Sequence, residues 1–217
     1  MALFVDTKFG AVQVVELSGD LPAEAVQRFD TPPYVGVDTE TSGLDWSIDQ
    51  LGLVQVFLPA LNTVFLLRPT EAPPSNLITL LSSDAWIKVF HFALFDLRFL
   101  AARWNVQPSN IRCTKIASKL LSPVQNRHSL ADLLASRLDV ILSKDPLVRT
   151  SDWTARRLSE EQLRYAALDA YYLPRLIQFL EAELAEQSRL HLAMKCFSFI
   201  PTQLQIDQLG SSDLFGY

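Results

Sequence analysis

Two acidic residues, Asp38 and Glu40, follow directly on a short apolar segment, Tyr34 to Val37. Flanked by Pro32-Pro33 and Ser42-Gly43, this segment is typical of a buried central strand. Because side chains alternate along a strand, both carboxylates point to one face, about 6.5 Å apart along the chain. Carboxylates that face the same way repel each other unless a cation lies between them, so the pair predicts a divalent metal site. The alternative is a strand that simply ends in solvated acids.

Three more residues extend this chemistry. Asp96 lies one turn into Ala93 to Trp104, a segment with the apolar spacing of an amphipathic helix. An acid near a helix N-terminus is favourable by itself, so Asp96 alone is weak evidence for a site. Tyr165 and Asp169, four residues apart, share one face of a helix that begins with a capping box at Ser159. The acids therefore come from a central strand, a mid-chain helix and a C-terminal helix.

The elements that must position these residues predict an α/β fold. Strands are expected at 3–5, 11–15, 34–37, 51–58, 63–67, 86–90 and 111–113, and helices at 18–29, 76–82, 93–104, 114–121, 129–138 and from 159. Residues 59–62 predict a hairpin, and 144–152 a surface loop. Pro174 is expected to kink the last long helix, which resumes through about Glu186. The order predicts a mixed five-stranded sheet with helices on both faces, to which the first strands add an edge.

Composition limits the function classes. The 217 residues are enough for one full α/β domain, and 49% hydrophobic with 20% charged residues is typical of soluble globular proteins. No apolar run reaches the roughly 18 residues that a membrane span needs, and no leader is evident, so we expect a cytoplasmic protein without a membrane partner. Cys113 and Cys196 are too far apart to indicate a disulfide framework or a zinc site.

The charge distribution separates one segment from the rest of the chain. The net charge of −5 argues against a nucleic-acid partner, yet residues 112–164 carry ten Lys/Arg against six Asp/Glu. Such a segment predicts contact with a phosphate backbone, and a solvated basic face is the competing interpretation. The basic residues concerned are Lys115, Lys119, Arg127, Lys144, Arg149, Arg156, Arg157 and Arg164.

Three segments in order resemble the DEDD superfamily of 3′–5′ exonucleases, in particular the ribonuclease D branch. They are 37–41 (Val-Asp-Thr-Glu-Thr), 91–97 (His-Phe-Ala-Leu-Phe-Asp-Leu) and 165–173 (Tyr-Ala-Ala-Leu-Asp-Ala-Tyr-Tyr-Leu). The flanking segments 151–153 and 158–163 are also similar to ribonuclease D. The resemblance covers about residues 33–180 and, through its Tyr-x-x-x-Asp spacing, implies the tyrosine subclass.

The resemblance implies a domain organisation. Residues 31–188 would form one exonuclease domain with a ribonuclease H-like fold, with 1–30 as an extension packed on it and 189–217 as a C-terminal tail. The tail has no clear period from Pro201 onward. Ribonuclease D proteins often carry C-terminal helical HRDC domains that grip RNA, and none is expected here. That difference predicts a short-form enzyme, or one that relies on a homodimer or a partner.

The resemblance also implies roles for the site residues. Asp38, Glu40, Asp96 and Asp169 would hold two Mg²⁺ or Mn²⁺ ions, and paired ions clamp the attacking and leaving oxygens of a phosphoryl displacement. Tyr165 would orient the attacking water, because a phenol with a pKa near 10 is a poor general base. The implied substrate contacts, for which a plain turn or a structural histidine is the alternative, are Thr41, Leu44, His91 and Phe92.

The function predicted from this resemblance is a metal-dependent 3′–5′ exoribonuclease that releases nucleoside 5′-monophosphates from single-stranded RNA ends. A DNA exonuclease, like proofreading domains or the Werner exonuclease, is the runner-up, because the sequence shows no contact that distinguishes a 2′-hydroxyl. A nucleic-acid-binding relative that has lost catalysis is the third hypothesis. The presence of all four acids and the tyrosine disfavours it.

Overall fold

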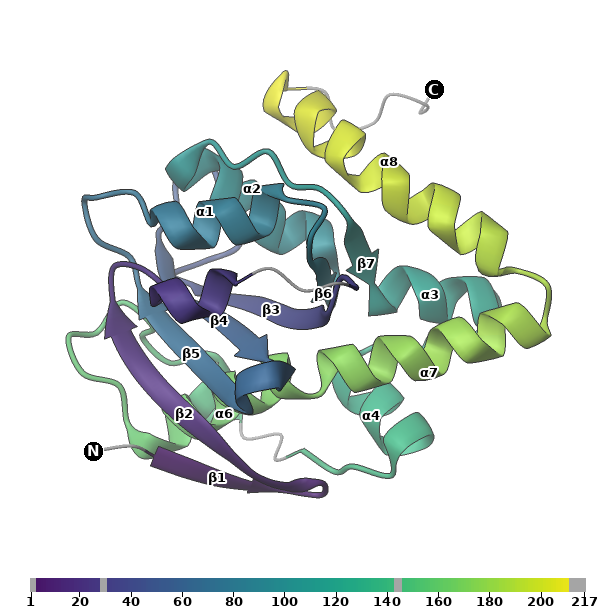
Figure 1. The fold of residues 1–217 in the computed structure, drawn as a ribbon, viewed down its shortest axis with the longest axis horizontal. Helices are drawn as coiled ribbons and strands as arrows, with labels where there is room; N and C mark the ends of the chain where they lie inside the picture. Colours follow the sequence, from purple (N-terminus) through teal and green to yellow (C-terminus); the bar gives the residue numbers. More distant parts are fainter. Residues whose placement is uncertain (1–2, 28–30, 143–145, 211–217) are drawn as a thin grey trace.

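The structure is a computed structural model that describes residues 3–27, 31–142 and 146–210. Its strands are β1 (Leu3–Thr7), β2 (Gly10–Ser18), β3 (Tyr34–Thr41), β4 (Leu51–Leu58), β5 (Thr63–Arg68), β6 (Ile87–Phe90) and β7 (Ile111–Cys113). Its α-helices are α1 (Ser75–Ser82), α2 (Ala93–Trp104), α3 (Thr114–Leu121), α4 (Leu130–Leu138), α5 (Pro146–Arg149), α6 (Glu160–Tyr171), α7 (Leu173–Glu186) and α8 (Leu190–Gln208). Helices lie on both faces of one mixed sheet (Figure 1), so the predicted α/β architecture is confirmed.

The sheet has seven strands rather than the expected five, in the order β1-β2-β5-β4-β3-β6-β7. The two additional strands form an antiparallel hairpin, and β2 pairs in parallel with β5 from Gln13↔Thr63 to Ser18↔Arg68. Val12 and Val14 are buried in an apolar cluster on one face of β2, while Gln13 between them is only partly buried. The N-terminal segment therefore completes the sheet, because without it the edge of β5 would have no partner strand.

The central strand β3 is antiparallel to β4 and parallel to β6. Val35 and Val37 belong to an apolar cluster that includes the buried leucines of α1 and α2. Gly36 lies on the other side of the strand, where a Cβ atom would be 2.0 Å from the carbonyl oxygen of Ala170 in α6. This absence of a side chain allows α6 to pack directly on β3, on the side that carries Asp38.

The start of α6 and the break after it follow the sequence prediction. Ser159 and Gln162 form the capping box, since each side chain accepts a hydrogen bond from the other's backbone N–H. The helix ends at Tyr171, and α7 begins at Leu173 with Pro174 in its first turn. Pro174 has no N–H to continue the helical hydrogen bonds, and α7 then runs to Glu186 as expected.

Three local predictions need correction. The predicted helix at 18–29 is a single 3₁₀ turn, Ala23–Val26, within the described residues, and Phe29 lies outside them. The loop predicted at 144–152 contains the short helix α5. Residues 201–208 of the segment without a clear period belong to α8, which an Arg98–Asp207 ion pair ties to α2, and residues 211–217 lie outside the described residues. Among the described residues, no helix combines the length and apolar character needed to cross a bilayer.

Candidate active site

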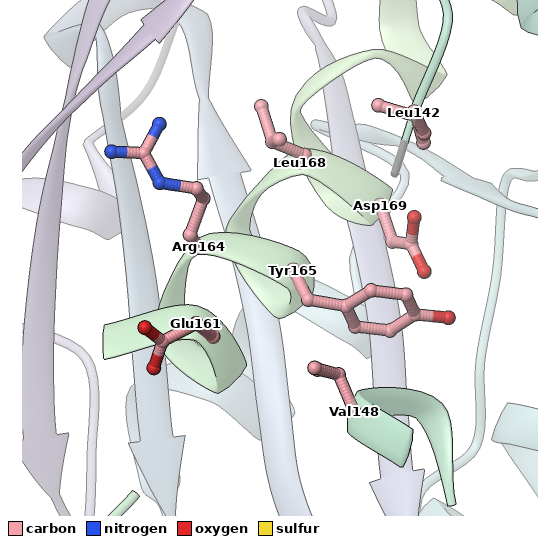
Figure 2. A pocket seen from close by; sticks show the side chains of 7 residues that line it. All are labelled: Leu142, Val148, Glu161, Arg164, Tyr165, Leu168 and Asp169. Carbon is pink, nitrogen blue, oxygen red and sulfur yellow. The ribbon is translucent and has the colours of Figure 1, made fainter. Parts of the chain in front are cut away.

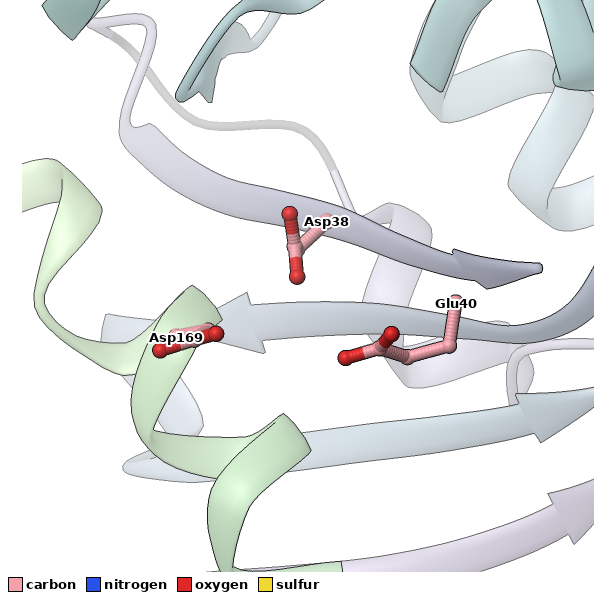
Figure 3. Close-up of side chains that lie close together, drawn as sticks. All are labelled: Asp38, Glu40 and Asp169. Carbon is pink, nitrogen blue, oxygen red and sulfur yellow. The ribbon is translucent and has the colours of Figure 1, made fainter. Parts of the chain in front are cut away.

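Three of the predicted acids converge in space. Asp38 and Glu40 project from β3 and Asp169 from α6, and one carboxylate oxygen of each lies within 4.8 Å of the others. Figure 3 shows the three side chains around one shared space. Strand β3 supplies two of them from one face, and the contact of α6 at Gly36 brings the third beside them.

The fourth acid, Asp96, adjoins this group from α2. Its carboxylate is only 2% exposed and accepts a hydrogen bond of 2.7 Å from the Oγ1 hydroxyl of Thr39, the residue between Asp38 and Glu40. Asp96 also lies close enough to repel Asp38. After burial, this repulsion is the largest cause of the raised pKa of Asp38. Thr39 thus connects Asp96 on α2 to Asp38 and Glu40 on β3. The sequence analysis did not predict this role, and its only signal there is the position of Thr39 between the two acids.

The electrostatics of the group are unfavourable without a cation. Burial, followed by mutual repulsion, raises the pKa of Asp38 well above its usual range and that of Glu40 to about 9. Burial also raises the pKa of Asp96 to about 7 and that of Asp169 to about 7. None of these four carboxylates forms an ion pair with a lysine or arginine of the described chain.

This donor set fits divalent cation binding. Hard cations prefer carboxylate oxygens, and a group of partly buried acids without basic partners is stable as a set of anions only when cations neutralise it. Asp38, Glu40 and Asp169 are close enough to share one ion, and Asp96 adds a fourth carboxylate at the edge of the same space.

Tyr165 projects from α6 on the same side as Asp169 (Figure 2). Burial, followed by the charges of Asp169, Glu40 and Asp38, raises the pKa of its phenol, so the hydroxyl stays protonated at neutral pH. Beside it lies a cavity of about 150 Å³ with mainly apolar walls. Its lining residues are Leu142, Val148, Glu161, Arg164, Tyr165, Leu168 and Asp169 (Figure 2).

The four predicted substrate residues have different environments. Leu44 is 84% exposed in the turn after β3, and Phe92 is 46% exposed. The Thr41 hydroxyl donates a 2.6 Å hydrogen bond to the Gly43 carbonyl, so it stabilises that turn. His91 Nδ1 is 2.8 Å from the Thr114 hydroxyl. Leu44 and Phe92 are thus available to a ligand, whereas Thr41 and the Nδ1 side of His91 have partners within the protein.

Phe92 has an unusual backbone, because its φ of 70° lies in the left-handed region that non-glycine residues rarely occupy. It forms the N-cap of α2, and its ring lies 4.2 Å from the Nζ of Lys115 in a cation–π contact. His91 beside it is neutral, because burial and then the charge of Lys115 lower its pKa to about 4. Nothing in the sequence indicated the left-handed backbone.

The basic segment is largely exposed. Arg112 and Arg137 are paired with Glu181 and Glu183 and therefore contribute to packing. Lys144 lies outside the described residues. The exposed members are Lys119, Arg127, Arg149, Arg156, Arg157 and Arg164.

The chain matches a family model described as 3′–5′ exonuclease over residues 15–185. It is 35% identical to DNA polymerase I of Aquifex aeolicus over 153 residues, which are 70% of this chain and 24% of that protein. It is 32% identical to ribonuclease D of Jannaschia sp. over 168 residues, which are 76% of this chain and 43% of that protein. The chain therefore spans less than half the length of these two relatives.

A solved structure matches over almost the whole length. Brucella melitensis NrnC bound to pGG is 37% identical, with a TM-score of 0.84, and the match covers 95% of this chain and 99% of that one. The family match over residues 15–185 takes in all four acids and Tyr165. The chain therefore belongs to the 3′–5′ exonuclease family, as a DEDD-superfamily protein similar to ribonuclease D and NrnC.

Proposed function

We propose that this chain is a metal-dependent 3′–5′ exoribonuclease that releases nucleoside 5′-monophosphates from single-stranded 3′ ends. The observation that carries the proposal is the convergence of Asp38, Glu40 and Asp169 within 4.8 Å, with Asp96 beside them and no basic partner for any of the four in the described chain. The similarity to ribonuclease D supports RNA as the substrate.

In this proposal each residue of the site has a stated role. The four carboxylates hold two Mg²⁺ or Mn²⁺ ions, which when bound lower the pKa of the attacking water and stabilise the leaving 3′-oxygen. Tyr165 orients that water through its hydroxyl, since a phenol with an ordinary pKa near 10 is a poor general base at neutral pH. The Tyr-x-x-x-Asp spacing on α6 thus places the orienting group one turn from a metal ligand.

Substrate contacts follow from exposure and charge. Leu44 and the Phe92 ring offer apolar surface to a base or sugar, and Lys115 at the Phe92 ring offers a positive charge to a phosphate. NrnC was solved bound to pGG, which supports pGG as one substrate of this chain as well. The exposed arginines of the basic segment would contact the backbone of longer RNA.

A DNA 3′–5′ exonuclease is the second candidate. The similarity to DNA polymerase I over 70% of the chain favours it, because the carboxylate chemistry is the same for both nucleic acids. We also propose that residues 31–188 act as one exonuclease domain. A homodimer remains a prediction that light scattering of the purified chain would test.

The deciding experiment compares matched single-stranded RNA and DNA oligomers, and pGG, with Mn²⁺ present. We expect stepwise release of nucleoside 5′-monophosphates from RNA, faster than from DNA, and no release by the Asp38→Asn variant. A preference for DNA would replace the first candidate by the second. Release that persists unchanged in Asp38→Asn would show that the site assignment is wrong.

A further inference from the structure

Gln55, in the middle of β4, is a polar side chain with no exposed surface. Neither its Nε2 nor its Oε1 atom has a hydrogen-bond partner among the described residues. Leu53 and Phe57, which share its side of β4, belong to an apolar cluster. Because burying an amide without a hydrogen-bond partner costs free energy, an apolar side chain of similar size would stabilise this position better. The amide therefore calls for a functional explanation.

The strand register places this amide next to the acids. Gln55 is the direct partner of Asp38 across the antiparallel β3–β4 pair. Directly opposite residues point to the same face, with their Cβ atoms about 4.5–5.5 Å apart. Ala166 and Ala167 of α6 belong to the same cluster as Leu53, so the helix that carries Asp169 covers this face of β4.

Asp96 shows which kind of contact is missing at Asp38, because its carboxylate accepts a hydrogen bond from the Thr39 hydroxyl. Asp38 accepts no hydrogen bond from any described side chain, although Gln55 lies directly opposite. Carboxylates that ligate metals are generally oriented by such outer donors, and their loss weakens metal binding by about 10–100-fold.

We propose that Gln55 is a positioning residue whose amide N–H donates a hydrogen bond to the Asp38 carboxylate when the site holds its metal ions. The inference rests on the proposed function, because it requires that Asp38 is a metal ligand. It explains why a polar residue is kept in apolar surroundings.

The test is an isothermal titration of the metal-free full chain with Mn²⁺, for wild type, Gln55→Met and Gln55→Leu. We expect both variants to bind Mn²⁺ about tenfold or more weakly. Their melting temperatures without metal should be equal to or above that of wild type, because the unpartnered amide is gone. Leu66→Met is the matched control, since Leu66 pairs with Gln55 from β5, and its Mn²⁺ affinity should equal that of wild type.

The outcomes separate the two proposals. If wild type binds no Mn²⁺, the proposed function fails. If wild type binds Mn²⁺ and both Gln55 variants bind it equally tightly, the proposed function stands and Gln55 has no positioning role. A second measurement on wild type covers variants that do not fold: the side-chain amide signals of Gln55 should shift when Mg²⁺ is added, and unchanged signals would overturn the inference.

Discussion

The two sides of β3 contrast within one strand. On one side, Val35 and Val37 are fully buried in an apolar cluster. On the other side, Gly36 contacts the backbone of α6, and Asp38 and Glu40 follow with strongly raised pKa values. The valines of the first side stabilise the metal-free fold, whereas burying the unneutralised carboxylates of the second side costs free energy. The fold therefore supports a site that is unfavourable until cations bind.

The largest expected effect comes from exchanging one residue on each side. Asp38→Asn should lower kcat by about 10³-fold, because a metal ligand acts on charge that develops in the transition state. Val37→Ala should leave kcat nearly unchanged but lower the free energy of unfolding by about 2 kcal/mol through a cavity. Single-turnover cleavage of an RNA oligomer and urea unfolding measure the two effects. The contrast fails if Val37→Ala is the more damaging to kcat.

The contact between β3 and α6 can be broken with one methyl group. In Gly36→Ala the new Cβ would lie 2.0 Å from the Ala170 carbonyl, so α6 must move and carry Asp169 with it. We expect a loss of about 1–3 kcal/mol in stability and about 10²-fold in kcat. In the control Gly52→Ala, the Cβ would meet the Trp153 carbonyl at 2.8 Å, and the smaller shift should largely spare kcat. Equal kcat losses in both variants would contradict the assigned role of Gly36.

Tyr165→Phe sharpens the role of the hydroxyl on the acidic side. Removing an orienting group should lower kcat by about 30-fold, which is less than the 10²–10⁴-fold that a general base contributes. If the hydroxyl orients the water and takes no proton from it, wild-type kcat should show no titration that is lost in Tyr165→Phe. The measurement is the pH dependence of kcat for wild type and Tyr165→Phe. A loss of kcat larger than 30-fold, together with a wild-type kcat that rises with pH, would identify Tyr165 as a base.

The smallest effect is on stability without metal. The pKa values of Glu40, about 9, and of Asp96 and Asp169, about 7, lie above the usual values near 4, so the folded protein binds more protons than the unfolded chain. In EDTA, the contribution of these acids to the melting temperature should therefore be most favourable below about pH 4. It should be lost as pH rises towards 9. Glu40→Gln should weaken this dependence, and saturating Mg²⁺ should reduce it. A melting temperature that rises with pH in the metal-free wild type, and not in Glu40→Gln, would contradict the raised pKa assigned to Glu40.

Patterns among neighbouring residues were enough to predict much of the fold and part of the site. The alternation that places Asp38 and Glu40 on one face, the capping box at Ser159 and the break before Pro174 all depend on near neighbours in sequence, and the structure agrees with them. Asp169 was placed by resemblance to a family, since no sequence spacing shows that α6 packs on β3.

The features that the sequence did not predict depend on distant partners. The first strands were expected at the edge of the sheet, but the parallel pairing of β2 with β5 was not. Helix α8 is anchored by contacts that include the Arg98–Asp207 ion pair. The left-handed backbone of Phe92 and the position of Gln55 opposite Asp38 likewise follow from tertiary structure and strand register. None of these has a signature in a single stretch of sequence.

The most direct test is a crystal of the chain soaked in Mn²⁺, with anomalous diffraction measured at the manganese edge. Our account predicts two manganese peaks among the carboxylates of Asp38, Glu40, Asp96 and Asp169. Peaks located elsewhere, or a site in which Asp169 contacts no ion, would contradict it.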